Sequence, residues 1–222
     1  PIRTNKAYIA KDGDILSIKS AKQGLRCYLA VTGGFDVPLF MGSAATNLKI
    51  KVGGFNGRKL KAGDILKIGK ADKIKNIEKR ELPENTYNNP VKVRVVLGPQ
   101  DDMFSENDLL LFSNQQYTVT SDLDRMGIRL WGIALRGKEK LEIISDAITF
   151  GSIQITNSGM PIILMADHQT TGGYAKIATV ISADLPKLAQ VKPKDKISFE
   201  IIDIDIAEKI AIKQKKHIDK LF

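Results

Sequence analysis

The chain has 222 residues, of which 43% are hydrophobic and 27% charged, and it holds one cysteine, Cys27, and two histidines. This composition excludes a disordered chain, an internal disulfide and a multi-cysteine metal site. The sequence shows no long apolar run and no leader, so we expect a cytoplasmic globular protein without membrane contact. The net charge of +9 arises in residues 1–90, with 17 Lys+Arg against 8 Asp+Glu, whereas residues 91–222 hold 17 of each. Because arginines and aromatics are sparse, we expect no nucleic acid, and either a solvated basic face or one that attracts anionic substrates or an acidic partner.

Short β-branched runs bounded by turn residues predict strands along most of the chain. They lie at residues 27–31, 91–97, 117–120, 148–155, 161–165 and 177–181. Glycine pairs such as Gly33-Gly34 and Gly172-Gly173 separate them. We therefore expect a mainly β fold, a barrel or a sandwich, in which Cys27 is a buried and inert thiol.

A weak repeat runs through the sequence. Residues 11–18 (KDGDILSI) recur as residues 61–68 (KAGDILKI), with a degenerate copy at residues 194–199 (KDKISF). Each copy predicts a tight turn that enters a strand, because Gly and Asp favour turns and the apolar alternation that follows is typical of a half-buried strand.

Helical patterns are few. Ser105 is a predicted N-cap for a helix at residues 105–111, and Asp205 is a predicted cap for an amphipathic C-terminal segment. We expect that segment to pack its apolar residues on the barrel, namely Ile206, Ile210, Ile218 and Leu221. The polar stretch at residues 72–89 predicts a boundary between domains at 1–90 and 91–222.

The residues at 166–176 (ADHQTTGGYAK) gather an acid, an imidazole, an amide, two hydroxyls, a phenol and an amine around a glycine pair. One interpretation is an anion site, in which flexible backbone N–H groups and Lys176 receive a carboxylate or phosphate. The other is a polar hairpin loop between two strands. His168 fits either a general base or a hydrogen-bonded loop residue.

Two further runs contain clustered charges. In residues 121–129, Arg125 or Arg129 can clamp a carboxylate, with Asp124 as a base or as the partner that orients Arg125; a structural ion pair is the alternative. In residues 98–102 (GPQDD), the paired acids suit either Mg²⁺ binding or capping of the next helix.

Taken in order, these runs resemble a known family. The motifs lie in residues 24–66, 93–104 (VRVVLGPQDDMF), 117–132 (YTVTSDLDRMGIRLWG) and 144–190, the last including MADHQTTGGYAK. They resemble the C subunit of 5-oxoprolinase, a family also described as allophanate hydrolase subunit 2 or as the C/D component of biotin-dependent carboxyltransferases. The chain is also similar to one half of the carboxyltransferase region of urea carboxylase.

The resemblance implies cyclophilin-like β-barrel domains, of which the first is incomplete at its N-terminus here. It also implies an active complex with the A and B subunits of 5-oxoprolinase that cleaves 5-oxo-L-proline to L-glutamate, with ATP and Mg²⁺ held by the complex. Two alternatives remain. One is a carboxyltransferase component that uses carboxybiotin on urea or another amide, and the other is a regulatory protein that binds a homologue of the B subunit and antagonises this kinase inhibitor.

The same resemblance suggests roles for individual residues. Lys176, Arg125 and Arg129 are expected to receive anionic groups, Asp124 and Asp167 to act as base or contact Mg²⁺, and His168 and Tyr174 to handle protons. The remaining candidates provide hydrogen bonds or backbone freedom: Gln154, Gln169, Thr170, Thr171, Gly172 and Gly173. Family members commonly carry arginine at the position of His168 and proline at that of Ala175, so this chain departs from the pattern at both.

Overall fold

The computed structural model describes residues 2–71, 74–84 and 86–221, without the side chain of residue 78. Its contacts divide the chain into two units: Pro1–Ile18 with Cys27–Glu84 form unit 1, and Lys19–Arg26 with Asn85–Phe222 form unit 2. The expected domain ranges 1–90 and 91–222 stay a prediction. Of the expected linker at 72–89, residues 72, 73 and 85 lie outside the described part.

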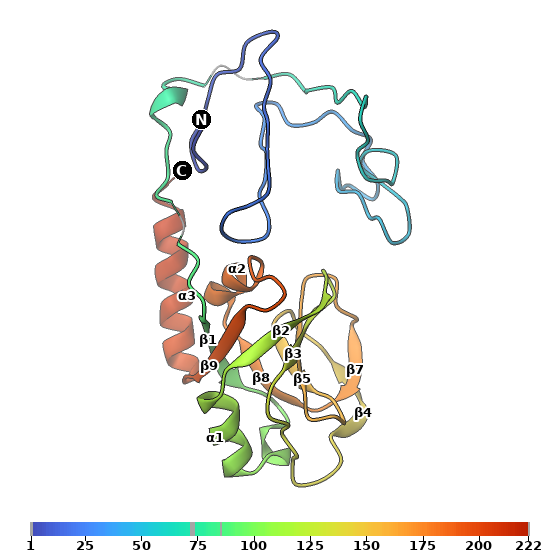
Figure 1. Cartoon of the computed structure of the whole chain (residues 1–222), viewed down its shortest axis with the longest axis vertical. Coiled ribbons are helices and arrows are strands. Elements are labelled where there is room, and N and C mark those ends of the chain that lie inside the picture. The colour runs from blue at the N-terminus through green and yellow to red at the C-terminus, as the bar shows by residue number, and fades with distance from the viewer. Residues whose placement is uncertain (1, 72–73, 85, 222) are drawn as a thin grey trace. The chain divides into compact units, whose positions relative to one another are not determined.

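Unit 2 is built on a closed β-barrel (Figure 1). The strands follow the order β1-β8-β5-β6-β3-β2-β9, and the pairing of β9 with β1 closes the barrel. That pair is parallel, whereas the other pairs in the barrel are antiparallel. The barrel strands are β1 (Val91–Leu97), β2 (Tyr117–Leu123), β3 (Gly127–Trp131), β5 (Ser152–Ile155), β6 (Pro161–Leu164), β8 (Lys176–Val180) and β9 (Lys196–Ile201). A separate two-stranded sheet pairs β4 (Glu142–Ala147) with β7 (Thr171–Tyr174).

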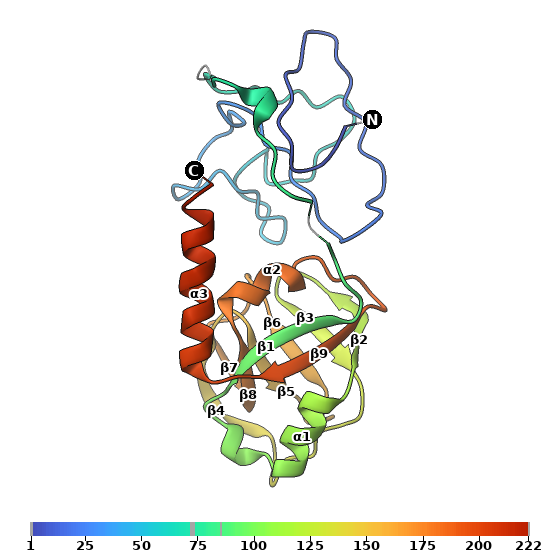
Figure 2. The same ribbon diagram turned by 90° about the vertical axis from the view of Figure 1, so that its left-hand side faces the viewer.

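The helices lie around this barrel, with α1 and α2 at opposite ends and α3 along its outside (Figures 1 and 2). They are α1 (Glu106–Asn114), α2 (Leu185–Leu188) and α3 (Ile204–Ile218), and unit 2 also contains the short 3-10 turns η2 (Asp101–Met103) and η3 (Ser182–Asp184). The 3-10 turn η1 (Ile77–Lys79) belongs to unit 1. No helix in the described ranges has the length and apolar composition needed to cross a membrane. The mainly β barrel with a C-terminal helix confirms the expected fold class.

The core lies inside the barrel and under α1. Alternate residues of β2 are buried, so Tyr117 and Val119 point inward, as period-two strands require. Phe112 of α1 stacks on Phe199 of β9 with ring centroids 4.5 Å apart, and Tyr117 tilts against both rings. Each such buried side chain contributes about 1.5–3 kcal/mol by leaving water. These contacts fix the strands that carry the candidate site.

The helix predictions were right in position and partly wrong in detail. Ser105 caps α1 in a reciprocal capping box with Asp108, which confirms that prediction. The N-cap of α3 is Asp203, and Asp205 lies inside the first turn, so the predicted cap was wrong. The predicted packing face of α3 was right for Ile210, which is half-buried beside Ala207, Ala211 and Gln214. It was wrong for Ile206, Ile218 and Leu221, which are 45%, 46% and 43% exposed.

Several strand predictions were confirmed, but two were not. Strands β1, β2, β6 and β8 occupy the expected positions, whereas the run at 148–155 forms a strand only over its last four residues. Residues 27–31 form no strand; Cys27 is exposed and Tyr28 is 88% exposed, so the expectation of a buried thiol was wrong. A short apolar run alone does not make a strand, because the backbone N–H and C=O groups also need hydrogen-bond partners on a neighbouring strand.

The predicted turns of the repeat are confirmed and share one geometry. In each turn the backbone N–H of the aspartate donates to the lysine carbonyl three residues earlier, and the lysine N–H donates back to the carboxylate. The pairs are Lys11 with Asp14, Lys61 with Asp64, and Lys192 with Asp195. In the described part of the chain only the third turn enters a named strand, β9.

We expect Lys194→Gly to stabilise unit 2. The third residue of each turn has positive φ, 83° at Gly13, 86° at Gly63 and 78° at Lys194. Glycine adopts this conformation without the steric cost that a Cβ atom adds, so the gain should be about 0.5–1 kcal/mol. Urea unfolding measures it, with Lys192→Gly in the same turn as control. A midpoint that falls in the Lys194 variant would contradict the prediction.

Candidate functional site

Three predicted site residues lie on one row across the outer face of the barrel. Lys176 on β8 pairs with Gln154 on β5, Gln154 with Ile162 on β6, and Ile162 with Arg129 on β3. Paired residues on adjacent strands point to the same face, and strands lie about 4.8 Å apart. The neighbours of Arg129 on β3 are core residues, so the row faces outward. Sequence reasoning named these residues, and the barrel register brings them into line.

The β4–β7 sheet covers part of this row. Gln154 is 2% exposed, and its Nε2 donates to the Tyr174 carbonyl at 3.2 Å. A Cβ atom on Gly172 would lie 2.5 Å from Ile148 Cδ1 and 2.7 Å from Gln154 Nε2, so β7 approaches closely only because glycine stands there. Gln154 therefore holds β7 against β5, while Arg129 at the other end of the row is exposed.

The buried side chain of Lys176 is the centre of a network that we call the Lys176 cluster, made of Gln100, Asp146 and Lys176, in which the Asp146 side chain is 48% exposed. The ammonium is 3% exposed and donates to Asp146 Oδ2 at 2.5 Å and to the Ala147 carbonyl at 2.9 Å. Gln100 Nε2 donates to the same carboxylate oxygen at 3.3 Å, and Gln100 Oε1 accepts the Lys176 backbone N–H at 3.2 Å. The hydrogen bond from Lys176 lowers the pKa of Asp146 below its ordinary value. The cluster joins β4, β8 and the turn after β1.

Sequence reasoning missed Asp146, and it singled out Gln100 only as part of a turn. Asp146 lies in β4, whose residues are exposed except for half-buried Ile143, and no spacing marks it as a partner of Lys176. Lys176 was predicted to meet an anion. In the structure the nearest anion is the chain's own carboxylate, on a strand 30 residues earlier.

The charges of residues 121–129 are placed differently from the sequence interpretation. Arg125 Nε and Nη2 donate to the two carboxylate oxygens of Asp167 at 2.7 and 2.8 Å. Asp124 Oδ1 instead accepts the backbone N–H groups of Met126 and Gly127, so Asp124 shapes the β2–β3 turn. Arg125 and Asp167 link this turn to the loop before β7, and an exposed pair of this kind contributes about 0–1 kcal/mol.

The other predicted residues lie on the loop that enters β7 and on that strand. The His168 ring Nδ1 is 2.6 Å from the Gln169 carbonyl, and the Thr170 carbonyl accepts the backbone N–H of Ile148. Thr171, Gly172, Gly173 and Tyr174 form β7. This loop and strand therefore form the rim of the row, with both ends tied to neighbouring elements.

The described residues do not fit Mg²⁺. They contain no group of three or more His, Cys, Asp or Glu side chains placed to hold a metal ion. The carboxylates of Asp124, Asp146 and Asp167 already accept N–H groups from the chain. Asp101 and Asp102, the predicted acid pair, lie in the first turn of η2. We derive no chemical step through a metal ion on this chain.

A matched glycine pair tests the packing of β7. Gly172→Ala is expected to destabilise unit 2 by about 1–3 kcal/mol, because its Cβ would collide with Ile148 and Gln154. Gly173→Ala should cost less, since the nearest atom lies 3.3 Å from its Cβ position. Urea unfolding of both variants gives the comparison, and equal costs would contradict this packing.

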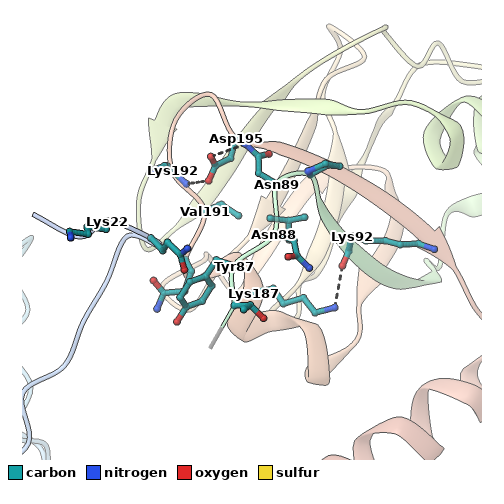
Figure 3. A pocket seen from close by; sticks show the side chains of 15 residues that line it. Lys22, Tyr87, Asn88, Asn89, Lys92, Lys187, Val191, Lys192 and Asp195 are labelled. Carbon is teal, nitrogen blue, oxygen red and sulfur yellow. Dashed lines mark hydrogen bonds between the residues drawn. The ribbon is translucent and has the colours of Figure 1, made fainter. Parts of the chain in front are cut away.

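A cavity of about 340 Å³ lies elsewhere in unit 2, and none of the predicted site residues lines it (Figure 3). Its wall includes residues 22–24, Tyr87 and the segment after α2, and contains four lysines and one aspartate. Gln190 holds residues 24–26 in place: its Oε1 accepts the N–H groups of Leu25 and Arg26 at 2.9 Å, and its Nε2 donates to the Arg26 carbonyl at 3.1 Å.

We expect Gln190→Ala to release this segment. The variant loses three hydrogen bonds to Leu25 and Arg26, so their backbone N–H groups should exchange with solvent at least about tenfold faster. Hydrogen exchange read by mass spectrometry measures this, with Gln169→Ala as control. Unchanged hydrogen-exchange rates of residues 24–26 would contradict the proposed role of Gln190 in holding this segment.

Both the sequence and the fold of this chain are similar to those of known proteins. Residues 1–201 match the family model described as carboxyltransferase domain, subdomain A and B. The chain is 39% identical to the 5-oxoprolinase C subunit of Haemophilus influenzae, covering all of this chain and 70% of the relative, and 37% identical to that of Escherichia coli, covering 95% and 67%. The crystal structure of the K. lactis urea amidolyase superposes with a TM-score of 0.88 at 29% identity, over all of this chain and 15% of that one. This chain therefore belongs to the family of the 5-oxoprolinase C subunit, within the carboxyltransferase domains of subdomains A and B.

Proposed function

We propose that this chain is the C subunit of an ATP-dependent 5-oxoprolinase, which hydrolyses 5-oxo-L-proline to L-glutamate in the cytoplasm together with the A and B subunits. The observation that carries the proposal is the 39% identity, along the whole chain, to a protein named as the C subunit of 5-oxoprolinase. Two such relatives match, and both extend beyond the aligned part.

The candidate row suits a small anionic amide. 5-Oxoproline carries one carboxylate and a lactam, and exposed Arg129 offers a guanidinium that binds a carboxylate through two parallel hydrogen bonds. The rim strand β7, which lies over Gln154 of the same row, and the loop before it provide the Thr170 and Thr171 hydroxyls, the Tyr174 phenol and the His168 imidazole for hydrogen bonding and proton transfer. The Lys176 cluster anchors β4, the strand that pairs with the rim strand β7.

ATP and Mg²⁺ belong, in this proposal, to the assembled complex. A lactam carbonyl is a poor electrophile, so its hydrolysis at useful rates needs an activating group and donors that stabilise the developing charge. The carboxylates described above are bound to the chain's own N–H groups, and the sequence has no phosphate-binding glycine loop. This supports a shared site, to which this chain contributes substrate binding.

One observation favours a second candidate function. The TM-score of 0.88 with a urea amidolyase, and the carboxyltransferase family model, fit a protein that accepts a carboxyl group from carboxybiotin on a partner. Biotin would then be a bound substrate, and the acceptor would be urea or another amide.

Glutamate release from 5-oxoproline by this chain reconstituted with its cognate A and B subunits tests the proposal. We expect turnover that requires ATP, Mg²⁺ and all three proteins, and that stops when this chain alone is omitted. Assembly without glutamate release, together with carboxylation of urea by added carboxybiotin, would replace the proposal with the second candidate. Turnover that persists without this chain would overturn the oxoprolinase proposal, and failure to carboxylate urea would overturn the second candidate.

A further inference from the structure

Helix α3 uses one face against the barrel. Ala207 is buried, Ile210, Ala211 and Gln214 are half-buried, and Gln214 Nε2 donates to the Ala183 carbonyl in η3 at 3.4 Å. The C-terminal half of the helix continues past the end of the barrel at which α2 lies (Figures 1 and 2). The packing face of the helix is therefore already in use.

The opposite face carries a row of lysines. Lys209, Lys213, Lys216 and Lys220 are spaced four, three and four residues apart, and all four are exposed. At 100° per residue, Lys216 lies about 180° around the helix from Ala207. The row spans 11 residues, or about 16 Å, and faces away from the barrel.

The lysine row surrounds an apolar centre. A groove of about 420 Å³ is lined entirely by α3 and the turn that follows it: Lys209, Ile212, Lys213, Lys216, His217 and Lys220. Ile212 is 55% exposed at its middle. An apolar residue inside a charged rim is the arrangement found at the centre of protein interfaces.

The row is not neutralised within unit 2. No ion pair among the described residues involves any of its four lysines. Like charges at i and i+4 cost a helix about 0.2–0.5 kcal/mol per pair, so a partner that supplies carboxylates would stabilise α3. Residues 91–208 hold 12 Lys+Arg and 16 Asp+Glu, whereas residues 209–222 hold 5 and 1. The positive charge of this half of the chain is thus concentrated on the helix.

We propose that this face of α3, comprising the lysine row and Ile212, docks an acidic protein surface that carries an apolar side chain over Ile212. The inference rests on the proposed function, in which the docking partner is the B subunit. A membrane surface would require a broad apolar face beside the lysines. Ile206, Ile212 and Ile218 are exposed, but they are six residues apart and so lie about 120° from one another around the helix, which gives no single apolar face. A nucleic-acid site would favour arginines and aromatic rings, and the row has neither.

The test is binding of the purified B subunit to the wild-type chain and to Lys213→Glu/Lys216→Glu, measured by calorimetry at two salt concentrations. We expect the variant to bind at least tenfold more weakly and to lose most of the salt dependence. Lys19→Glu/Lys140→Glu makes the same change in net charge at exposed lysines outside α3 and should bind as the wild type does. Circular dichroism verifies that α3 stays helical.

A second pair of variants tests the contribution of Ile212, the apolar centre of the groove, to binding. Ile212→Ala should weaken binding about fivefold without changing its salt dependence, because it removes contact area and no charge. Ile133→Ala, at a residue 63% exposed on unit 2, should leave binding unchanged. If Ile212→Ala has no effect while the lysine variant binds weakly, the apolar part of the proposal is wrong.

The outcomes separate this inference from the proposed function. If the wild-type chain supports turnover with the A and B subunits and the lysine variant binds the B subunit equally well, only the docking surface is overturned. If the wild-type chain neither binds the B subunit nor supports turnover, both are overturned. If the lysine variant loses affinity for anionic lipid vesicles or RNA but keeps its affinity for the B subunit, the assigned partner class is wrong.

Discussion

Replacement of Asp184 by asparagine is expected to destabilise unit 2 by about 1–3 kcal/mol, because half-buried Arg94 and exposed Lys187 lose their buried counter-charge. The Asp184 side chain is 0% exposed and accepts three hydrogen bonds from Arg94: from the backbone N–H at 2.8 Å, Nε at 2.9 Å and Nη2 at 2.7 Å. Lys187 Nζ lies 2.8 Å from the same carboxylate. Asparagine keeps the volume but offers one acceptor oxygen and no charge.

The same residue makes stability depend on pH. Burial disfavours the charged carboxylate, but hydrogen bonds from Arg94 and Lys187 outweigh that effect and lower the pKa of Asp184 to about 2. The folded pKa lies below the ordinary value of about 3.9, so the stabilisation is complete above about pH 5 and is lost as the pH falls through 3.9 toward 2. The Asp184→Asn variant should lack this part of the acid dependence.

Urea unfolding of unit 2 signals at pH 7, 4 and 3 measures both effects. Asp122→Asn is the control, since Asp122 is exposed on β2. We expect the difference between wild type and Asp184→Asn to be largest at pH 7 and to narrow at pH 3. A constant difference across this range would contradict the assigned role of the carboxylate.

Local sequence patterns correctly predicted several strands of the barrel. Residues 91–97 are apolar at five of seven positions, and they form β1 over the expected bounds because each edge of this segment has a neighbouring strand in the barrel. The run at 27–31 has a similar composition but no strand beside it in the described part of unit 1. Pairing over long sequence distances decides between these cases, and composition does not encode it.

The sequence motifs name residues of the candidate site, but they do not predict how these residues are arranged in space. Gln154, Arg129 and Lys176 could be named from motifs, but their alignment depends on the register of four strands, including a shift between Ile153 and Gln154. The partner of Arg125 proved to be Asp167, 42 residues away, rather than its sequence neighbour. Asp146 escaped notice because a single aspartate in a polar strand carries no spacing signal.

Loss of the Lys176 ammonium is expected to reduce turnover of the reconstituted complex by at least about 100-fold. Lys176→Met keeps the length of the side chain in its buried site and removes only the charge and its three donors. Asp146 and the Ala147 carbonyl then lose their link to β8, and the β4–β7 sheet that carries the site rim loses an anchor. We expect the fall mainly in kcat, because Arg129, the residue proposed to bind the substrate carboxylate, is unchanged.

Asp146→Asn and the double variant distinguish positioning from direct contact with the substrate. If Lys176 acts through Asp146, each single change breaks the same link, so the double variant should be no slower than Lys176→Met alone. If Lys176 instead binds the anionic substrate directly, Asp146→Asn should free the ammonium for that role and leave turnover near the wild-type value. Rate losses that multiply in the double variant would show two independent roles and would contradict the Lys176 cluster as a unit. Co-purification with the A and B subunits must be equal for all variants, since the cluster lies on the barrel and not on α3.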